Sequence, residues 1–201
     1  MCRLIAGFCL IVACSQAFAA KEPAVTKAFV DSRSVHIITT DGRDHTIEPR
    51  KWQAGGGSDE IEVAPDGRTV GWLVNQMLTP LAGATNYSYA VAVELDIWRD
   101  GRVVRKFSAG QAIRNWMFLK QGDEAAFHTG PLHGQEFYDC TLFDVNTGKQ
   151  ISHWALERKD YVVPDWVKPL LANDPLPGPD EISNWVEDHS EAKKAAPPAK
   201  Q

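Results

Sequence analysis

Cysteine is nearly absent from this chain once its first 20 residues are set aside. Three of the four cysteines, Cys2, Cys9 and Cys14, fall in that opening stretch, and Cys140 is the fourth. A lone cysteine cannot form a disulfide within the chain, so side-chain packing has to hold the fold together. Long hydrophobic runs are lacking too, because after residue 20 none approaches the about 20 apolar residues that a membrane-spanning helix needs. We therefore expect neither disulfide bonds nor a transmembrane span.

Basic residues are outnumbered by acidic ones. The chain has 21 Lys and Arg against 26 Asp and Glu, which gives a formal net charge of −5. No segment concentrates Lys and Arg into the stripe that contacts a nucleic-acid backbone. The charge pattern therefore predicts no DNA or RNA partner.

Common catalytic motifs are also missing. The sequence has no Gly-x-Ser-x-Gly turn that would present a serine nucleophile. Gly55-Gly56-Gly57-Ser58 lacks the Lys that completes a phosphate-binding loop, so we interpret it as a flexible link. The motif content predicts a protein that is not an enzyme and holds no cofactor.

Residues 1–20 have the pattern of a cleaved signal peptide. Arg3 precedes the apolar run from Leu4 to Ala13, and Ala17-Phe18-Ala19 supplies the small residues that a signal peptidase recognises. This pattern predicts export to the periplasm or the exterior of a bacterial cell. An alternative stays open, because Ile11-Val12-Ala13-Cys14-Ser15 resembles a lipobox, in which Cys14 would carry a lipid anchor to the cell envelope.

Alternating apolar residues around short turns dominate the next part of the chain. The segment from Ile61 to Trp72 predicts a strand, a tight Pro65-Asp66-Gly67 turn and a second strand. A period of two with apolar residues on one side is typical of an antiparallel pair with one buried face. A degenerate copy of this hairpin follows from Trp116 to Phe127.

Three further hairpins extend the pattern to two and a half copies of one repeated unit. Each has alternating or β-branched strands around a Gly-containing turn. The segment from Lys21 to Asp31 is weakly patterned, and we expect an extended arm there. The three predicted hairpins pair Ser34–Thr40 with Asp44–Glu48, Ala90–Trp98 with Val103–Phe107, and Phe137–Val145 with Lys149–Trp154.

These turns resemble the TolB-type propeller repeat, a relative of the WD-type blade. Ala64-Pro65-Asp66-Gly67-Arg68 is similar to the Ser-Pro-Asp-Gly-Lys turn of that family, and Asn146-Thr147-Gly148-Lys149 is similar to its closing turn. The resemblance implies propeller-blade-like hairpins, but two and a half units are too few to close a propeller of about four to eight blades. We expect an all-β, antiparallel domain over residues 21–163, with about ten strands in an open sheet, in two packed sheets or in a ring shared between chains.

The last part of the chain differs in character. Pro164 to Leu171 predicts a short helix whose apolar side covers an exposed strand edge, and Asp180 to His189 predicts a second one. We therefore expect a C-terminal helical segment over residues 164–192 that packs on the sheet. Residues 193–201, which include Pro197-Pro198, are predicted to be disordered.

Two histidines mark the best place to look for chemistry. His128 and His133 flank a Gly130-Pro131 turn and, with Asp139, offer ligands for a metal ion or a general base. Their spacing matches no known zinc motif, and polar loop residues are mostly turn formers. A metal-assisted hydrolase that uses His128 and His133 is therefore kept as an alternative function.

The favoured hypothesis is a secreted or periplasmic binding or scaffold protein without catalysis. Repeated sheets often serve as recognition surfaces, which is an analogy at the level of fold. We expect a protein partner or a cell-envelope component to contact the two longer connections, Met77–Tyr87 and His128–Glu136. The candidate contact residues are Pro80, Asn86, Tyr87, His128 and His133.

Overall fold

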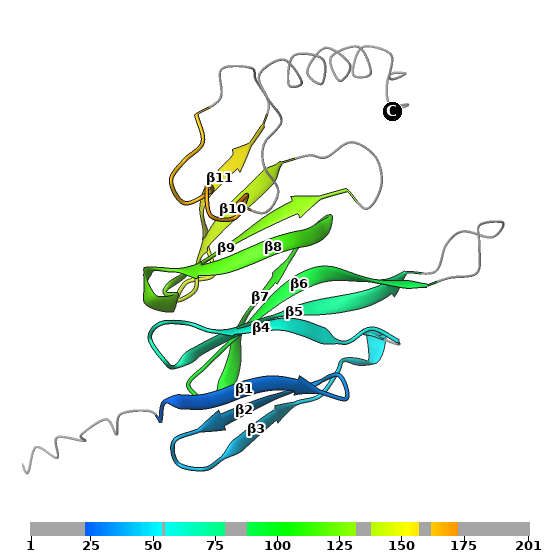
Figure 1. Cartoon of the computed structure of the whole chain (residues 1–201), viewed down its shortest axis with the longest axis vertical. Coiled ribbons are helices and arrows are strands. Elements are labelled where there is room, and N and C mark those ends of the chain that lie inside the picture. The colour runs from blue at the N-terminus through cyan, green and yellow to red at the C-terminus, as the bar shows by residue number, and fades with distance from the viewer. Residues whose placement is uncertain (1–22, 54, 79–87, 132–137, 157–161, 173–201) are drawn as a thin grey trace, which may run out of the picture.

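The computed structural model describes residues 23–53, 55–78, 88–131, 138–156 and 162–172 of the 201-residue chain (Figure 1). The described residues form eleven strands in three separate sheets, and every strand pair is antiparallel. Helix in these segments is limited to two 3-10 turns, η1 (Lys51–Gln53) and η2 (Lys120–Gly122). The predicted all-β antiparallel class is confirmed.

Each sheet is a simple meander in which neighbours in sequence are neighbours in space. The first sheet holds three strands, and the second and third sheets hold four each. The first consists of β1 (Val25–Asp31), β2 (Ser34–Thr39) and β3 (Asp44–Ile47). The second consists of β4 (Ser58–Val63), β5 (Thr69–Leu78), β6 (Tyr89–Arg99) and β7 (Arg102–Ser108). The third consists of β8 (Ala112–Leu119), β9 (Glu124–Gly130), β10 (Asp139–Asp144) and β11 (Gln150–Ala155).

All five predicted hairpins form. In the one with the clearest sequence signal, Gly67 has a φ of 65°, a left-handed conformation that glycine adopts without steric cost. The Asp66 carboxylate accepts hydrogen bonds from the backbone N–H groups of Arg68 and Thr69, both at 2.8 Å. The Pro-Asp-Gly turn is therefore closed by its own residues, which explains why a local pattern was enough to find it.

The expected extended arm over residues 21–31 is wrong for its larger part. Val25–Asp31 forms β1, which pairs with β2 along its length. Ser32 and Arg33 make the connection with φ values of 48° and 78°, as a two-residue hairpin turn requires. No Gly or Asn marks this turn, so the usual sequence signal is missing.

The three sheets are stacked, with the second sheet between the first and the third (Figure 1). Toward the first sheet, Val70, Trp72 and Val74 of β5 pack with Val35 and Ile37 of β2. The residues that alternate with these three along β5 face the third sheet, where they meet a cluster that includes Trp116, Phe118 and Phe127. Burying one such aliphatic side chain stabilises a fold by roughly 1.5–3 kcal/mol.

This stacking corrects the expectation of one buried face. Seven consecutive residues of β5, from Thr69 to Asn75, are buried, so both faces of this strand are covered. It also differs from two of the three predicted arrangements, the open sheet and the two packed sheets, and the ring shared between chains stays a prediction. The described strands close into no barrel. Three sheets stack because the second sheet carries apolar side chains on both of its faces, and each face is covered by a neighbouring sheet.

The start of the C-terminal segment packs on the third sheet as predicted but is not helical. Residues 165–172 form successive turns, with Val167 N–H donating to Pro164 O at 3.0 Å. Pro169 has no N–H to donate, which interrupts a regular helix at this point. Val167, Leu170 and Leu171 are buried on the outer face of the sheet rather than along a strand edge.

The rest of the predicted helical segment, residues 173–192, and the predicted tail, 193–201, lie outside the described residues, as does the signal-peptide segment 1–20. Within the described segments, no helix has the length and apolar character needed to cross a membrane.

Candidate functional site

The structure does not bring His128 and Asp139 together. His128 lies on β9 directly opposite Cys140 of β10, so these two side chains share one face of the third sheet. Asp139 is the neighbour of Cys140 and points to the other face, where it contacts His153 at 3.1 Å. The third candidate, His133, lies outside the described residues. Among the residues that are described, no group of three His, Cys, Asp or Glu side chains is placed to hold a metal ion.

The neighbouring Cys140 and His128 have the residue types of a nucleophile and its base. Both are buried, with residue exposures of 0% and 2%, and the His128 ring stacks on Tyr138 at a centroid distance of 5.6 Å. Burial, with a smaller contribution from Asp139, raises the pKa of the Cys140 thiol to about 12. A reactive cysteine needs a lowered pKa and access to substrate. This pair is therefore part of the core.

The predicted partner-binding residues are mostly beyond what the structure describes. Pro80, Asn86, Tyr87 and His133 lie in the segments 79–87 and 132–137. His128 is the exception, and its burial removes it from the surface that a partner could touch.

A buried ionic cluster that the sequence analysis missed lies between the first and second sheets. Glu94 and Asp96 are two residues apart on β6, on the face toward the first sheet that they share with Trp98. Arg50, which follows β3, donates from one terminal nitrogen to Glu94 and from the other to Asp96. Ser108 of β7 donates to the second Glu94 oxygen at 2.9 Å. The cluster thus joins the connection after the first sheet to two strands of the second.

The pKa values of the two carboxyl groups in this cluster are shifted in opposite directions. Burial, together with the hydrogen bond to Glu94, raises the pKa of Asp96 to about 7. For Glu94 burial also opposes ionisation, but hydrogen bonds with Asp96, Arg50 and Ser108 outweigh it and lower the pKa. The difference follows from depth, because the Asp96 side chain is 3% exposed and that of Glu94 is 12% exposed. Glu94 therefore carries the negative charge, and Asp96 holds the proton until the pH rises to about 7.

Carboxyl pairs with separated pKa values are typical of acid–base catalysts, so the access of substrate to this pair matters. A cavity of about 300 Å³ opens beside Arg50. Neither Glu94 nor Asp96 belongs to its lining, which consists of Ser32, Arg33, Ser34, Glu48, Pro49, Arg50 and Lys51. The geometry supports a structural ion pair. The sequence signal for it was the Glu-Leu-Asp alternation inside an otherwise apolar strand.

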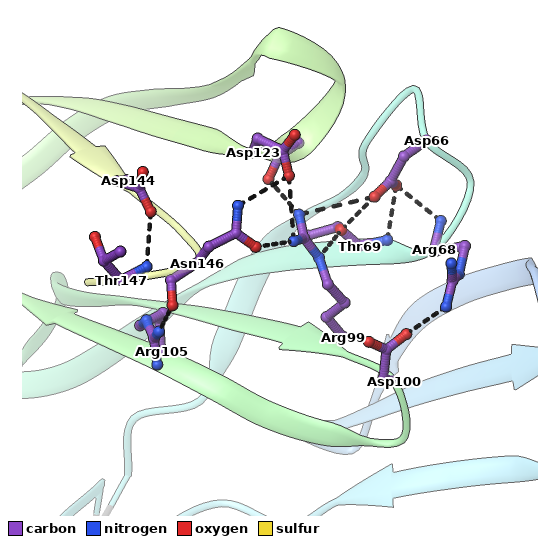
Figure 2. Close-up of polar contacts among 11 residues, drawn as sticks. Asp66, Arg68, Thr69, Arg99, Asp100, Arg105, Asp123, Asp144, Asn146 and Thr147 are labelled. Atoms are coloured by element: carbon purple, nitrogen blue, oxygen red, sulfur yellow. Dashed lines mark hydrogen bonds and ion pairs between the residues drawn. The ribbon is translucent and has the colours of Figure 1, made fainter. Parts of the chain in front are cut away.

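A second polar network ties the turns of the second and third sheets together (Figure 2). Its centre is Arg99 at the end of β6, whose Nε donates to Thr69 Oγ1 at 2.6 Å. One terminal nitrogen donates to Asn146 Oδ1 at 2.7 Å and to Asp123 Oδ1 at 3.3 Å. The other donates to the carbonyl of Gly122 at 2.7 Å. One guanidinium group thus contacts turn residues from both sheets.

Gly122 allows these turns to approach. Its φ is 105°, and a Cβ at this position would lie 2.8 Å from Cβ of Ala64, closer than real Cβ contacts come. The neighbouring Gln121 carbonyl accepts a hydrogen bond from the backbone N–H of Asp66 at 3.2 Å. The two predicted hairpin turns therefore touch, which their sequences alone did not indicate.

Comparison with known proteins adds no family. No protein-family model matches the chain, and no curated protein matches it.

Proposed function

We propose that this protein is an exported, non-catalytic binding or scaffold module. Its partner is a protein or a cell-envelope component, held by the connections between β5 and β6 and between β9 and β10. The signal-peptide pattern of residues 1–20 supports export, and the repeated hairpins support a recognition scaffold.

The observation that carries this proposal is that both connections leave the same end of the stacked sheets. The Arg99 network holds the start of β5, the end of β6 and the turns before β9 and after β10. Antiparallel strands that meet at one end must have their other termini at the far end. Leu78 and Tyr89 pair there in the second sheet, and Thr129 and Asp139 pair there in the third.

This arrangement suits a binding role. Both connections are anchored on the sheets, and the opposite ends of those sheets are locked together by hydrogen bonds. Loops held in this way on a rigid scaffold are the usual carriers of recognition in β-proteins. Because the two connections emerge from adjacent sheets, one partner can contact both.

The test is deletion of Pro80–Thr85 from the full chain, followed by crosslinked capture from the native envelope. We expect the free energy of unfolding to stay within about 1 kcal/mol of the wild type, since surface changes away from the core have small effects. Recovery of the captured component should fall by about tenfold or more, as it does when central contacts are lost.

Arg43→Ala is the matched control for this experiment. Arg43 is exposed beside the turn between β2 and β3 and pairs with Asp41 at 3.2 Å, away from both connections. Capture by the control should equal that of the wild type. Equal capture by the deletion variant would contradict the proposed role of the β5–β6 connection.

A further inference from the structure

A basic cavity lies at the opposite end of the stack from the two long connections. Its volume is about 410 Å³, within the range of about 300–1,000 Å³ that is typical of small-molecule sites. Three guanidinium groups and one carboxyl group belong to its lining, in a chain whose net charge is −5. The lining residues are Arg99, Asp100, Arg102, Val103, Val104, Arg105, Val145 and Asn146.

The acidic residues at this cavity are already engaged. Asp100 accepts a hydrogen bond from Arg68 at 2.7 Å. Asp123 is shared between Arg99 at 3.3 Å and the Asn146 amide at 3.2 Å (Figure 2). The charge of Arg99 is therefore largely offset by Asp123 and by Asp66, which lies 3.8 Å away, and that of Asp100 by Arg68. The charges that are left belong to Arg102 and Arg105.

Arg105 is held in place by main-chain carbonyl groups, and the nearby charge is that of Asp144, whose pKa Arg105 helps to lower. Its terminal nitrogens donate to the main-chain carbonyls of Val104, at 2.7 Å, and Asn146. Glycine at position 148 leaves room for the Arg105 side chain, because a Cβ there would lie 3.1 Å from the Arg105 Nε. No carboxylate in the described part of the chain forms an ion pair with Arg105. Carbonyl groups carry no net charge, so they orient this guanidinium, and its charge is only partly offset by Asp144, which does not lie within ion-pair distance.

Arg102 adds a second charge at the mouth of the cavity. It begins β7 at the hairpin turn, is exposed, and its side chain makes no hydrogen bond or ion pair with any residue that the structure describes. A guanidinium fork matches the oxygens of a phosphate or carboxylate group in two parallel hydrogen bonds. One fixed and one adjustable guanidinium on the same cavity form such a site.

We propose that this cavity binds a small organic anion through its phosphate or carboxylate group, with Arg102 and Arg105 as the charged contacts. The apolar part of the ligand lies against Val103, Val104 and Val145. The site is separate from the partner-binding connections, so it holds or fails independently of the function proposed above.

The test is a titration of the ¹⁵N-labelled protein with inorganic phosphate and, separately, with citrate, followed by amide chemical shifts. Both anions should give saturable shifts at Arg102, Asn146, Thr147 and Gly148. Arg102→Ala should weaken binding by about tenfold or more, the loss expected for a charge-assisted hydrogen bond. Because Arg102 supports no other described side chain, this variant should fold normally, and its unchanged spectrum elsewhere verifies that.

Two comparisons sharpen the result. Arg43→Ala removes an exposed arginine elsewhere and should bind both anions as the wild type does. Arg105→Lys keeps the charge but loses the fork, so it should bind more weakly than the wild type and more tightly than a double variant with Arg102→Ala and Arg105→Gln. Tighter binding of phosphate than of citrate would assign the natural group as a phosphate, and the reverse as a carboxylate.

Three results would overturn the proposal. These are shifts that rise linearly without saturation for both anions, saturable shifts confined to other parts of the chain, and binding that persists in the double variant. Equal shifts with glycerol, which is neutral, would show that charge is not the basis of recognition.

Discussion

At position 71 the second and third sheets approach so closely that only glycine fits. A Cβ on Gly71 would lie 2.6 Å from Cη2 and 2.7 Å from Cζ3 of Trp116, and 3.0 Å from Phe118 Cζ. Trp116 and Phe118 themselves meet edge to face, with ring centroids 5.2 Å apart. The indole thus occupies the space that a side chain on β5 would need. Glycine weakens a strand in isolation, and here close packing compensates for that.

We therefore predict that Gly71→Ala destabilises the protein by about 1–3 kcal/mol, the usual cost of overpacking a core. The methyl group would force Trp116 out of its place between the sheets. Urea unfolding followed by tryptophan fluorescence measures the change. Gly110→Ala is the control, because a Cβ there meets nothing within 4 Å. Equal losses in the two variants would show that the added methyl group is not what matters.

At the scale of elements, the Arg50 cluster joins the connection after the first sheet to β6. Arg50 also lies over the Trp52 ring, with its guanidinium carbon 5.5 Å from the ring centroid. The ion pair is buried, so removing one partner would leave an uncompensated charge inside the protein. The resulting loss of folding free energy is larger than the contribution of an exposed ion pair. A buried pair with one shared proton makes the association of these two sheets sensitive to pH.

The sign of that dependence follows from the raised pKa of Asp96. Between its ordinary value of 3.8 and about 7, the folded protein keeps a proton on Asp96 that the unfolded chain has released. The protonated Asp96 therefore contributes its full stabilisation to the folded state at low pH, and this contribution is lost as the pH rises through about 7. Glu94 has the opposite effect, because its pKa is lowered. Its contribution to stability is lost as the pH falls below its ordinary pKa of 4.5.

We predict that Asp96→Asn removes this part of the pH dependence. Asparagine has the shape of the protonated acid and cannot ionise, so the variant should gain stability relative to the wild type as the pH rises from about 4.5 to above 7. Urea unfolding at several pH values measures the difference. Asp31→Asn, which changes an exposed carboxyl group on β1, should follow the wild-type curve. A constant difference between Asp96→Asn and the wild type would contradict the shared-proton model.

At the scale of the whole molecule, the described chain is a stack of layers in sequence order. The first, second and third sheets follow one another along the long axis (Figure 1), and residues 162–172 pack against the outer face of the third sheet. The last layer covers Ala126, Cys140 and Leu142 of the third sheet. The Asn115 amide also donates to the Leu170 carbonyl at 2.7 Å. Without this layer, the third sheet would expose an apolar face.

We predict that Leu170→Ala destabilises the protein by about 2–5 kcal/mol, as expected for a buried leucine. Leu170 is 1% exposed and packs among the residues that face outward from the third sheet. The same variant should bind more of a dye that reports exposed apolar surface. Lys168→Ala is the control from the same segment, since Lys168 is exposed and, among the described residues, pairs only with exposed Asp165. A Leu170→Ala variant as stable as this control would mean that the C-terminal turns do not cover the sheet.

What the sequence determined by itself was the class of fold and the positions of the five hairpins that it predicted. These depend on residues within a few positions of one another, such as Gly67 after Pro65-Asp66 or Gly148 after Asn146-Thr147. A glycine that adopts positive φ and an Asp that closes its own turn act locally, so a short pattern is sufficient. The alternating apolar residues around them then predict strands for the same reason.

Only the tertiary structure decided which faces are covered and which polar groups meet. Arg50 reaches Asp96 across 46 positions, and Arg99 reaches Asn146 across 47. Gly71 is required because Trp116, from another sheet, fills its space. The turns of residues 165–172 are settled in the same way, because they pack on Ala126, Cys140 and Leu142, which are distant in sequence. Such contacts form between side chains that no local pattern relates, so they arise when the sheets stack and not before.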